Sequence, residues 1–342
     1  MSTIFIPTNA NSPVDLMMSF NLLQLFKEKN IATGLMLLIA NGKKGLWGKA
    51  KNQQYKNFQE ITNAKGKLPV IVMVSNLPLT ELDFYHLPEL SIEHIKLAID
   101  FVTDLPGRIG NPAISFHLNT LIPETEWQKS GDTPEEKLEY WQQQFAEKVW
   151  PAIQTVSNYA KQKKIELKIE TTPTPEFGDK LSVNLNTLGN PYPLYSGRGF
   201  KEVRTTGAGI ALDLCHTFTL YKAASRIHAQ GKELFKIYKG LFPADLKKIV
   251  NKNLMQEIEA LKKNDIVHLN DSRNLFDPNN NTLHEEGVPL GEGEIKNLPD
   301  IIKKILNKNL RLVFEVHEDN YNQRKNLQKS INYFLKHVYK NS

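Results

Sequence analysis

Cysteine is almost absent from the sequence. The chain of 342 residues contains one cysteine, Cys215, which excludes a disulfide scaffold and a cysteine-rich zinc module and is typical of a reducing compartment. No apolar run approaches the ~20 residues that are needed to span a bilayer. The first ten residues, MSTIFIPTNA, lack a basic region followed by an apolar core, so we expect no signal peptide and a cytoplasmic protein.

Low-complexity segments and exact repeats are also lacking, and short apolar runs alternate with helical patterns instead. Near-continuous apolar runs of this length are typical of strands that are covered on both faces. Eight such runs predict strands at residues 3–7, 34–40, 69–74, 113–118, 165–170, 209–214, 265–269 and 310–316. Apolar spacing and capping signals predict helices over 13–29, 91–103, 133–164, 232–263, 298–307 and 324–339, with a break near Pro151.

Eight strand–helix units predict a (β/α)₈ TIM barrel. The alternative is an open doubly wound sheet, which would need a glycine-rich phosphate turn after the first strand, whereas residues 7–11 read PTNAN. We therefore expect one TIM-barrel domain over residues 1–342, with insertions at about 171–207 and 218–263.

Histidine and acidic residues recur where the last five predicted strands end. In a barrel these ends meet at one rim, where active sites lie. An isolated charge at the end of a buried strand is costly unless it is paired or ligating, and each residue alone could be such a paired core residue or a helix cap. Together, however, the set predicts a site for a divalent metal ion, held by Glu170, Asp213, His268 and Glu315.

Three segments resemble the signature segments of endonuclease IV, the metal-dependent apurinic/apyrimidinic endonucleases. They read DLCHTF (213–218), HLNDS (268–272) and LGEGEI (290–295), in the family's order. Residues 37–49 (LLIANGKKGLWGK) and 113–120 (AISFHLNT) agree more loosely. That family belongs to the xylose isomerase-like TIM barrels, which also include sugar epimerases.

The resemblance implies a role for each matching residue. Glu170 would bridge two metals, with Asp213, His268 and Glu315 completing one shell. His117 would bind the ion on the other side of the bridge. His216 would bind a third ion, with His284 as a possible co-ligand, whereas His86 is either a further ligand or a residue that faces the next helix. The implied cofactor is one to three divalent ions per chain, with zinc expected first and manganese, magnesium or iron as alternatives.

The implied reaction is hydrolysis of a phosphodiester in DNA at abasic sites, with Glu170 and Glu315 as catalytic carboxylates. The expected DNA-binding residues are Lys43, Lys44, Trp47, Lys49, Asp271 and Arg273. The alternative reaction is isomerisation or epimerisation of a sugar or hydroxy acid at one metal, because Glu170, Asp213, His268 and Glu315 also resemble the single-metal site of the epimerases. In that case the segment 173–204, with Tyr192 and Tyr195, could form a lid or a dimer contact.

Charge is unevenly distributed along the chain. Lys and Arg number 43 and Asp and Glu 37, a net charge of +6. Residues 41–67 contain seven lysines and one acid, and four of the seven lie in the predicted rim loop 41–51 together with Trp47. Lysines beside an aromatic ring can hold phosphates while the ring contacts a base stack, although Trp47 could equally pack against the second helix.

Overall fold

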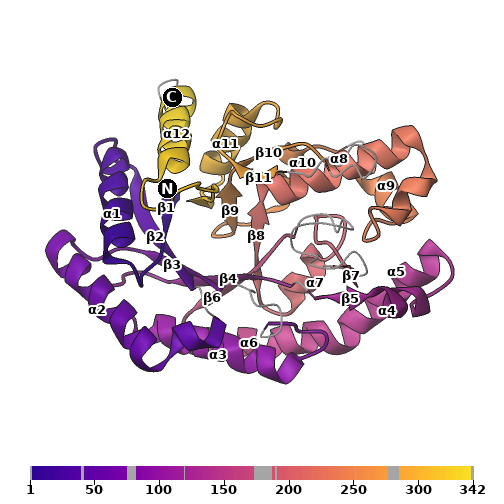
Figure 1. Cartoon of the computed structure of the whole chain (residues 1–342), viewed down its shortest axis with the longest axis horizontal. Helices are drawn as coiled ribbons and strands as arrows, with labels where there is room; N and C mark the ends of the chain where they lie inside the picture. Colours follow the sequence, from indigo (N-terminus) through magenta and orange to yellow (C-terminus); the bar gives the residue numbers. More distant parts are fainter. Residues whose placement is uncertain are drawn as a thin grey trace.

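Eight parallel strands close into a barrel, as the sequence predicts (Figure 1). The computed structural model describes residues 2–39, 42–74, 82–118, 120–172, 187–188, 191–250, 252–275 and 285–339. The strands follow each other around the barrel in the order β1-β12-β9-β8-β6-β4-β3-β2. They are β1 (Thr3–Thr8), β2 (Ala32–Ile39), β3 (Val70–Val74), β4 (Ala113–His117), β6 (Glu166–Glu170), β8 (Gly209–Asp213), β9 (Ile266–Leu269) and β12 (Arg311–Phe314). All eight predicted strands are confirmed.

Helices surround the strands (Figure 1). They are α1 (Pro13–Lys27), α2 (Gly48–Lys65), α3 (Pro88–Asp104), α4 (Glu124–Lys129), α5 (Pro134–Gln144), α6 (Trp150–Gln162), α7 (Phe200–Thr205), α8 (Leu214–Gln230), α9 (Pro243–Ile249), α10 (Leu254–Ala260), α11 (Leu298–Asn307) and α12 (Lys325–Phe334). Two small antiparallel pairs lie outside the barrel sheet: β5 (Ile122–Pro123) with β7 (Thr187–Leu188), and β10 (Asp271–Arg273) with β11 (Glu285–Val288). Within the described residues, no helix is long and apolar enough to cross a membrane.

Two predicted helical stretches differ from the structure. Helix α5 begins with the capping box that Thr133 predicts, and the expected break is a π-helical turn at Phe145–Val149, just before Pro151 enters the first turn of α6. The single helix predicted over 232–263 is wrong. That stretch contains a 3₁₀ turn (Lys232–Lys236), α9 and α10, because Pro243 has no amide hydrogen to donate within a continuous helix.

The second predicted insertion is partly a barrel helix. Residues 218–230 are the continuation of α8, which begins at Leu214 directly after β8. The single-domain organisation and the insertions themselves stay predictions.

The alternation of side chains along the strands creates a separate core inside the barrel. Its members are Phe5, Met36, Ile71, Met73, Ala113, Ala211, Ile266 and Val313. Successive strand residues point to opposite faces, so the residue two positions further along each strand also faces the interior. Those positions are Asp213 after Ala211, His268 after Ile266 and Glu315 after Val313. The strand pattern thus places polar groups above the apolar core.

A buried ion pair joins the first and last units of the barrel. The Arg324 Nε and a terminal guanidinium nitrogen donate to the two carboxylate oxygens of Asp15 at 2.8 and 2.7 Å. The two side chains are 2% and 6% exposed. Near the other ends of these two helices, Phe26 of α1 and Phe334 of α12 pack edge to face, with ring centroids 5.9 Å apart. These contacts hold α12 against α1.

Candidate metal centre

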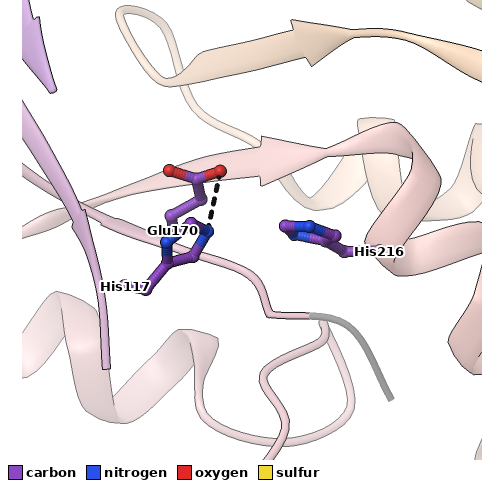
Figure 2. A group of neighbouring side chains, drawn as sticks. All are labelled: His117, Glu170 and His216. Atoms are coloured by element: carbon purple, nitrogen blue, oxygen red, sulfur yellow. Dashed lines mark ion pairs between the residues drawn. The ribbon is translucent and has the colours of Figure 1, made fainter. Parts of the chain in front are cut away.

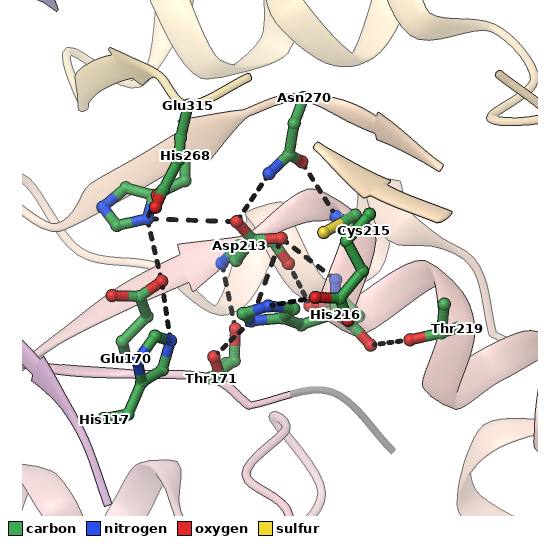
Figure 3. Close-up of polar contacts among 12 residues, drawn as sticks. His117, Glu170, Thr171, Asp213, Cys215, His216, Thr219, His268, Asn270 and Glu315 are labelled. Carbon is green, nitrogen blue, oxygen red and sulfur yellow. Dashed lines mark hydrogen bonds and ion pairs between the residues drawn. The ribbon is translucent and has the colours of Figure 1, made fainter. Parts of the chain in front are cut away.

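Four predicted ligands converge at the C-terminal ends of neighbouring strands. Glu170, Asp213, His268 and Glu315 come from β6, β8, β9 and the residue after β12, and their ligand atoms lie within 4.8 Å of one another (Figure 3). The His268 Nδ1 is 2.9 Å from the Glu170 Oε1, 2.5 Å from the Glu315 Oε2 and 3.9 Å from the Asp213 Oδ2. Because Asp213 and His268 are register partners, this geometry follows directly from the closed sheet.

Most ligand atoms of this group are buried without a hydrogen-bond partner. Glu170 and His268 are 0% exposed and Asp213 is 1% exposed. Both carboxylate oxygens of Glu170, both ring nitrogens of His268 and the Glu315 Oε2 lack a hydrogen-bond partner among the described residues. Buried polar atoms normally have partners, because leaving them unpaired costs free energy. Three carboxylates and one imidazole with free lone pairs fit a divalent ion such as zinc, manganese, magnesium or iron.

The electrostatics of the candidate metal centre favour positive charge. Burial raises the pKa of Glu170, but His117 and His268 outweigh it and hold that pKa below its usual range. Burial lowers the pKa of His268, yet Glu170 and Glu315 raise it well above its ordinary value. His216 is likewise buried, and Asp213 and Glu286 raise its pKa to about 10. Clustered carboxylates therefore attract a cation to this site.

A second group of possible ligands shares Glu170. It consists of His117, Glu170 and His216, and Figure 2 shows the His117 imidazole next to Glu170, with His216 to the right of both. The His117 Nε2 lies 3.1 Å from the Glu170 Oε1, and the two imidazole centroids are 5.5 Å apart. The His216 Nδ1 is 2.6 Å from the Thr171 carbonyl oxygen, which can only accept, so Nδ1 donates and Nε2 is left for a ligand.

Asp213 has two functions at the start of α8. Its Oδ1 accepts from the backbone amide of His216 at 3.0 Å, which makes it the N-cap of the helix. Its Oδ2 accepts from the Asn270 side chain at 2.7 Å and faces His268. The capping interaction therefore fixes the carboxylate that the metal centre uses.

Sequence reasoning missed two residues that position the ligands. The Asn270 side chain also accepts from the Cys215 amide at 3.0 Å, and the Thr171 Oγ1 accepts from the Asp213 amide at 2.9 Å (Figure 3). Asn270 lies two residues after His268, so the same strand alternation could have revealed it. Cys215 is buried, as expected, and burial raises the pKa of its thiol well above the ordinary value, which disfavours the thiolate that metals bind.

The predicted rim loop exposes an aromatic residue between lysines. A 3₁₀ turn (Gly42–Leu46) precedes α2, and Trp47 at the junction is 67% exposed. Packing of Trp47 against the second helix, the alternative reading, is therefore wrong. Lys44 and Lys49 are exposed beside it, whereas the Lys43 Nζ contacts the Glu93 Oε2 of α3 at 2.7 Å.

Asp271 has a structural role rather than the expected contact with substrate. Its buried carboxylate accepts from the backbone amides of Ser272, Gly291, Gly293 and Ile295 at 2.8 to 3.1 Å. A Cβ on Gly293 would lie 2.2 Å from the Asp271 Oδ1, which explains the second glycine of the LGEGEI segment. Asp271 thus anchors that segment to β10.

Two further predicted residues, Arg273 and His86, contact carboxylates outside the four-ligand group. Arg273 is exposed and contacts the Glu285 Oε2 at 3.1 Å. The His86 Nδ1 lies 2.8 Å from the Asp83 Oδ2, and its Nε2 lies 3.3 Å from the Glu126 Oε2. Both ring nitrogens of His86 therefore already have a carboxylate partner. His284 lies outside the described residues.

Tyr192 and Tyr195 are packed into the protein rather than free to cover a substrate. They are 4% and 0% exposed, and the Tyr195 hydroxyl donates to the Asp245 Oδ1 at 2.7 Å. The Arg198 guanidinium lies over both rings, 5.0 and 5.7 Å from their centroids. Tyr192 and Tyr195, in the segment 173–204 that was expected to form a lid or a dimer contact, therefore belong to the core.

The barrel and its ligand cluster define a family. The model of the xylose isomerase-like TIM barrel family matches residues 32–337, and the chain belongs to this family. No curated protein matches the sequence.

Solved structures similar to the chain include two nucleases and one isomerase-like protein. Endonuclease IV from Thermus thermophilus is 14% identical with a TM-score of 0.51, over 98% of this chain and 100% of the other. A family 2 AP endonuclease from Brucella melitensis is 10% identical with a TM-score of 0.51, over 99% and 100%. A putative sugar phosphate isomerase/epimerase from Anabaena variabilis is 15% identical with a TM-score of 0.50, over 96% and 88%. These superpositions show a shared fold. At identities this low they do not identify the reaction, which has to be inferred from the site.

Proposed function

We propose that the protein is a metal-dependent phosphodiester hydrolase that cleaves DNA at apurinic/apyrimidinic sites. The observation that carries the proposal is the position of Glu170, which belongs both to the four-residue group and to the group of His117, Glu170 and His216. One of its oxygens lies 3.1 Å from His117 and 2.9 Å from His268, and both oxygens lack hydrogen bonds. A carboxylate in this position can bridge two ions, which a two-metal hydrolase requires and a single-metal isomerase does not.

The chain's own residues would divide the work as follows. Asp213, His268 and Glu315 would hold one ion and His117 and His216 the other. Bound divalent ions polarise a phosphate and make hydroxide available near neutral pH. Lys44 and Lys49, exposed at the rim, would hold the DNA backbone by charge. Trp47 is sufficiently exposed to contact or wedge a base stack beside the missing base.

A second candidate function has one specific observation in its favour. The group of Glu170, Asp213, His268 and Glu315 is complete without His117 or His216. Two carboxylates, Glu170 and Glu315, lie on either side of His268, as an isomerase or epimerase would need to move a proton on a metal-bound sugar or hydroxy acid.

The test is incubation of the protein with duplex DNA that contains one abasic site, at low salt with zinc or manganese. We expect a single strand break at that site. His117→Ala should lose cleavage while retaining an ion at the four-residue group, and His228→Ala, an exposed histidine on α8, should cleave normally. No strand break by the wild-type protein would exclude the nuclease proposal. Epimerisation of a ketose that survives His117→Ala would establish the alternative.

A further inference from the structure

A cavity lies at the opposite end of the barrel from the candidate metal centre. Its volume is about 650 Å³, and its lining includes the first residues of β6 and β8 and the ends of α6 and α7. Glu166, in the lining, is four residues before Glu170 on the same strand, which separates the two ends by ~13 Å. The proposed hydrolase has no use for this end of the barrel.

The cavity has an excess of positive charge. Its acidic residues, Glu166 and Asp265, are already paired with cations. The Lys168 Nζ lies 2.9 Å from the Glu166 Oε2 and 3.8 Å from the Asp265 Oδ1, while Arg204 contacts the Asp265 Oδ2 at 2.7 Å and Arg311 contacts Glu166 at 2.7 Å. These contacts balance the acids within the barrel and leave no carboxylate for the other cations of the lining.

Four lysines of the lining are therefore uncompensated. Lys161 and Lys164 lie at the end of α6 and just beyond it, and Lys262 and Lys263 lie in the loop between α10 and β9. All four are exposed, and none has a carboxylate partner among the residues that the structure describes. Lysines scattered over a surface are simply solvated, but these four border one concave space from two separate segments. Together they add four positive charges to its lining.

A buried hydroxyl provides an independent sign of a ligand. Ser157 on α6 lines the cavity and is 5% exposed, yet its Oγ has no hydrogen-bond partner in the described part of the chain. The amide side chains of Gln154 and Asn158, on the same helix, also line the cavity. Buried hydroxyls normally have a partner, and an anionic oxygen inside the cavity would accept from Ser157.

We propose that this cavity binds a small molecule that carries a diphosphate or two phosphate groups. Two such groups balance the positive charge of the four uncompensated lysines, whereas a single phosphate would neutralise only about half of it. The volume lies within the ~300–1,000 Å³ of small-molecule sites. A concave site with a buried donor suits a compact ligand rather than a nucleic-acid backbone. The amides of Gln154 and Asn158 would contact the uncharged part of the molecule.

Calorimetric titration of the full chain with sodium pyrophosphate at low ionic strength tests the proposal. We expect saturable binding at one site, which weakens as salt is added because the lysines are exposed. The double variant Lys161→Ala/Lys262→Ala should lower the affinity at least about ten-fold, since it removes two charge-assisted contacts. Ser157→Ala should lower it by about two- to ten-fold. A parallel titration with ADP tests whether the amide-lined part adds affinity.

Two controls separate this cavity from the metal centre, where pyrophosphate could bind a metal ion. Lys44→Ala/Lys49→Ala removes the same charge at the other end of the barrel, and Glu170→Gln weakens the metal centre. Both should bind pyrophosphate as the wild-type protein does. The proposal is overturned if binding does not saturate, if Lys161→Ala/Lys262→Ala binds normally, or if the controls lose binding instead. Circular dichroism of each variant verifies that the fold is retained.

Discussion

Replacing Glu170 by Gln removes the carboxylate that the two ligand groups of the candidate metal centre share. An ion present at a hundred times its dissociation constant stabilises a folded protein by about 2.7 kcal/mol. The entropy of unfolding is about 2.1 cal/mol/K per residue, which gives about 0.7 kcal/mol/K for a chain of 342 residues. Zinc should therefore raise the melting temperature of the wild-type protein by about 4 °C over the chelator-treated protein.

The variant should lose most of this shift. Removing the hydrogen-bonding partner of a metal ligand costs ~10–100-fold in affinity, so removing a ligand should cost at least about 100-fold. The same zinc concentration then only equals the dissociation constant, and the shift falls below about 1 °C. Scanning calorimetry with and without EDTA measures both proteins.

Glu166→Gln is the matched control for this experiment. Glu166 lies on the same strand and the same face as Glu170 but at the other end of β6. Its loss can lower the melting temperature itself, but the zinc-induced shift should remain near 4 °C. A Glu170→Gln protein that retains the full zinc shift would refute the assignment of Glu170 as a ligand.

Three further predictions concern other parts of the molecule. Arg324→Met should destabilise the fold by about 3–5 kcal/mol in urea unfolding, because it leaves the buried Asp15 carboxylate without its cation; a loss below 1 kcal/mol would contradict this. A hydrogen bond to Asp83 raises the pKa of His86 above 6.5, so the stability that His86 contributes is complete below that pH and lost as the pH rises through the raised pKa. The melting temperatures of wild-type protein and His86→Asn should therefore differ more at pH 6 than at pH 9, and an equal difference at both would argue against the ion pair. Trp47→Ala should change the free energy of unfolding by less than about 0.5 kcal/mol, since the side chain is exposed, yet weaken binding of abasic DNA in a gel-shift assay; unchanged binding would remove Trp47 from the DNA-contacting surface.

The barrel could be predicted from the sequence because its strands are buried on both faces. Each strand is then a continuous apolar run, and eight such runs separated by helical patterns allow few other topologies. The ligands could be predicted for a related reason. A histidine or acid at the end of such a run is shielded from water. Burying it without a partner costs free energy, so its presence indicates an ion pair, a hydrogen bond or a metal. Glu170, Asp213 and His268 were identified on this basis and do lie together.

Long-range contacts explain what the sequence could not predict. Asp271 follows the ligand His268 closely, yet four amides from segments up to 24 residues away occupy its carboxylate. Lys43 belongs to the basic loop but turns to Glu93, fifty residues further along the chain. Helical periodicity over 232–263 concealed a 3₁₀ turn and two separate helices, because short helices and one long helix share the same apolar spacing. Each of these outcomes depends on which surfaces meet in the folded chain.

The charge of the metal centre bears on the number of ions that it can hold. Glu170, Asp213 and Glu315 contribute three negative charges, and the Glu286 carboxylate lies 3.7 Å from the His216 Nε2 as a fourth. Histidines that ligate a metal are neutral, so they do not offset these charges. One divalent ion would leave two negative charges, of which a protonated His216 would offset one, whereas two ions would neutralise all four. Because uncompensated buried charge is costly, this remaining charge supports a second ion and so the proposed hydrolysis.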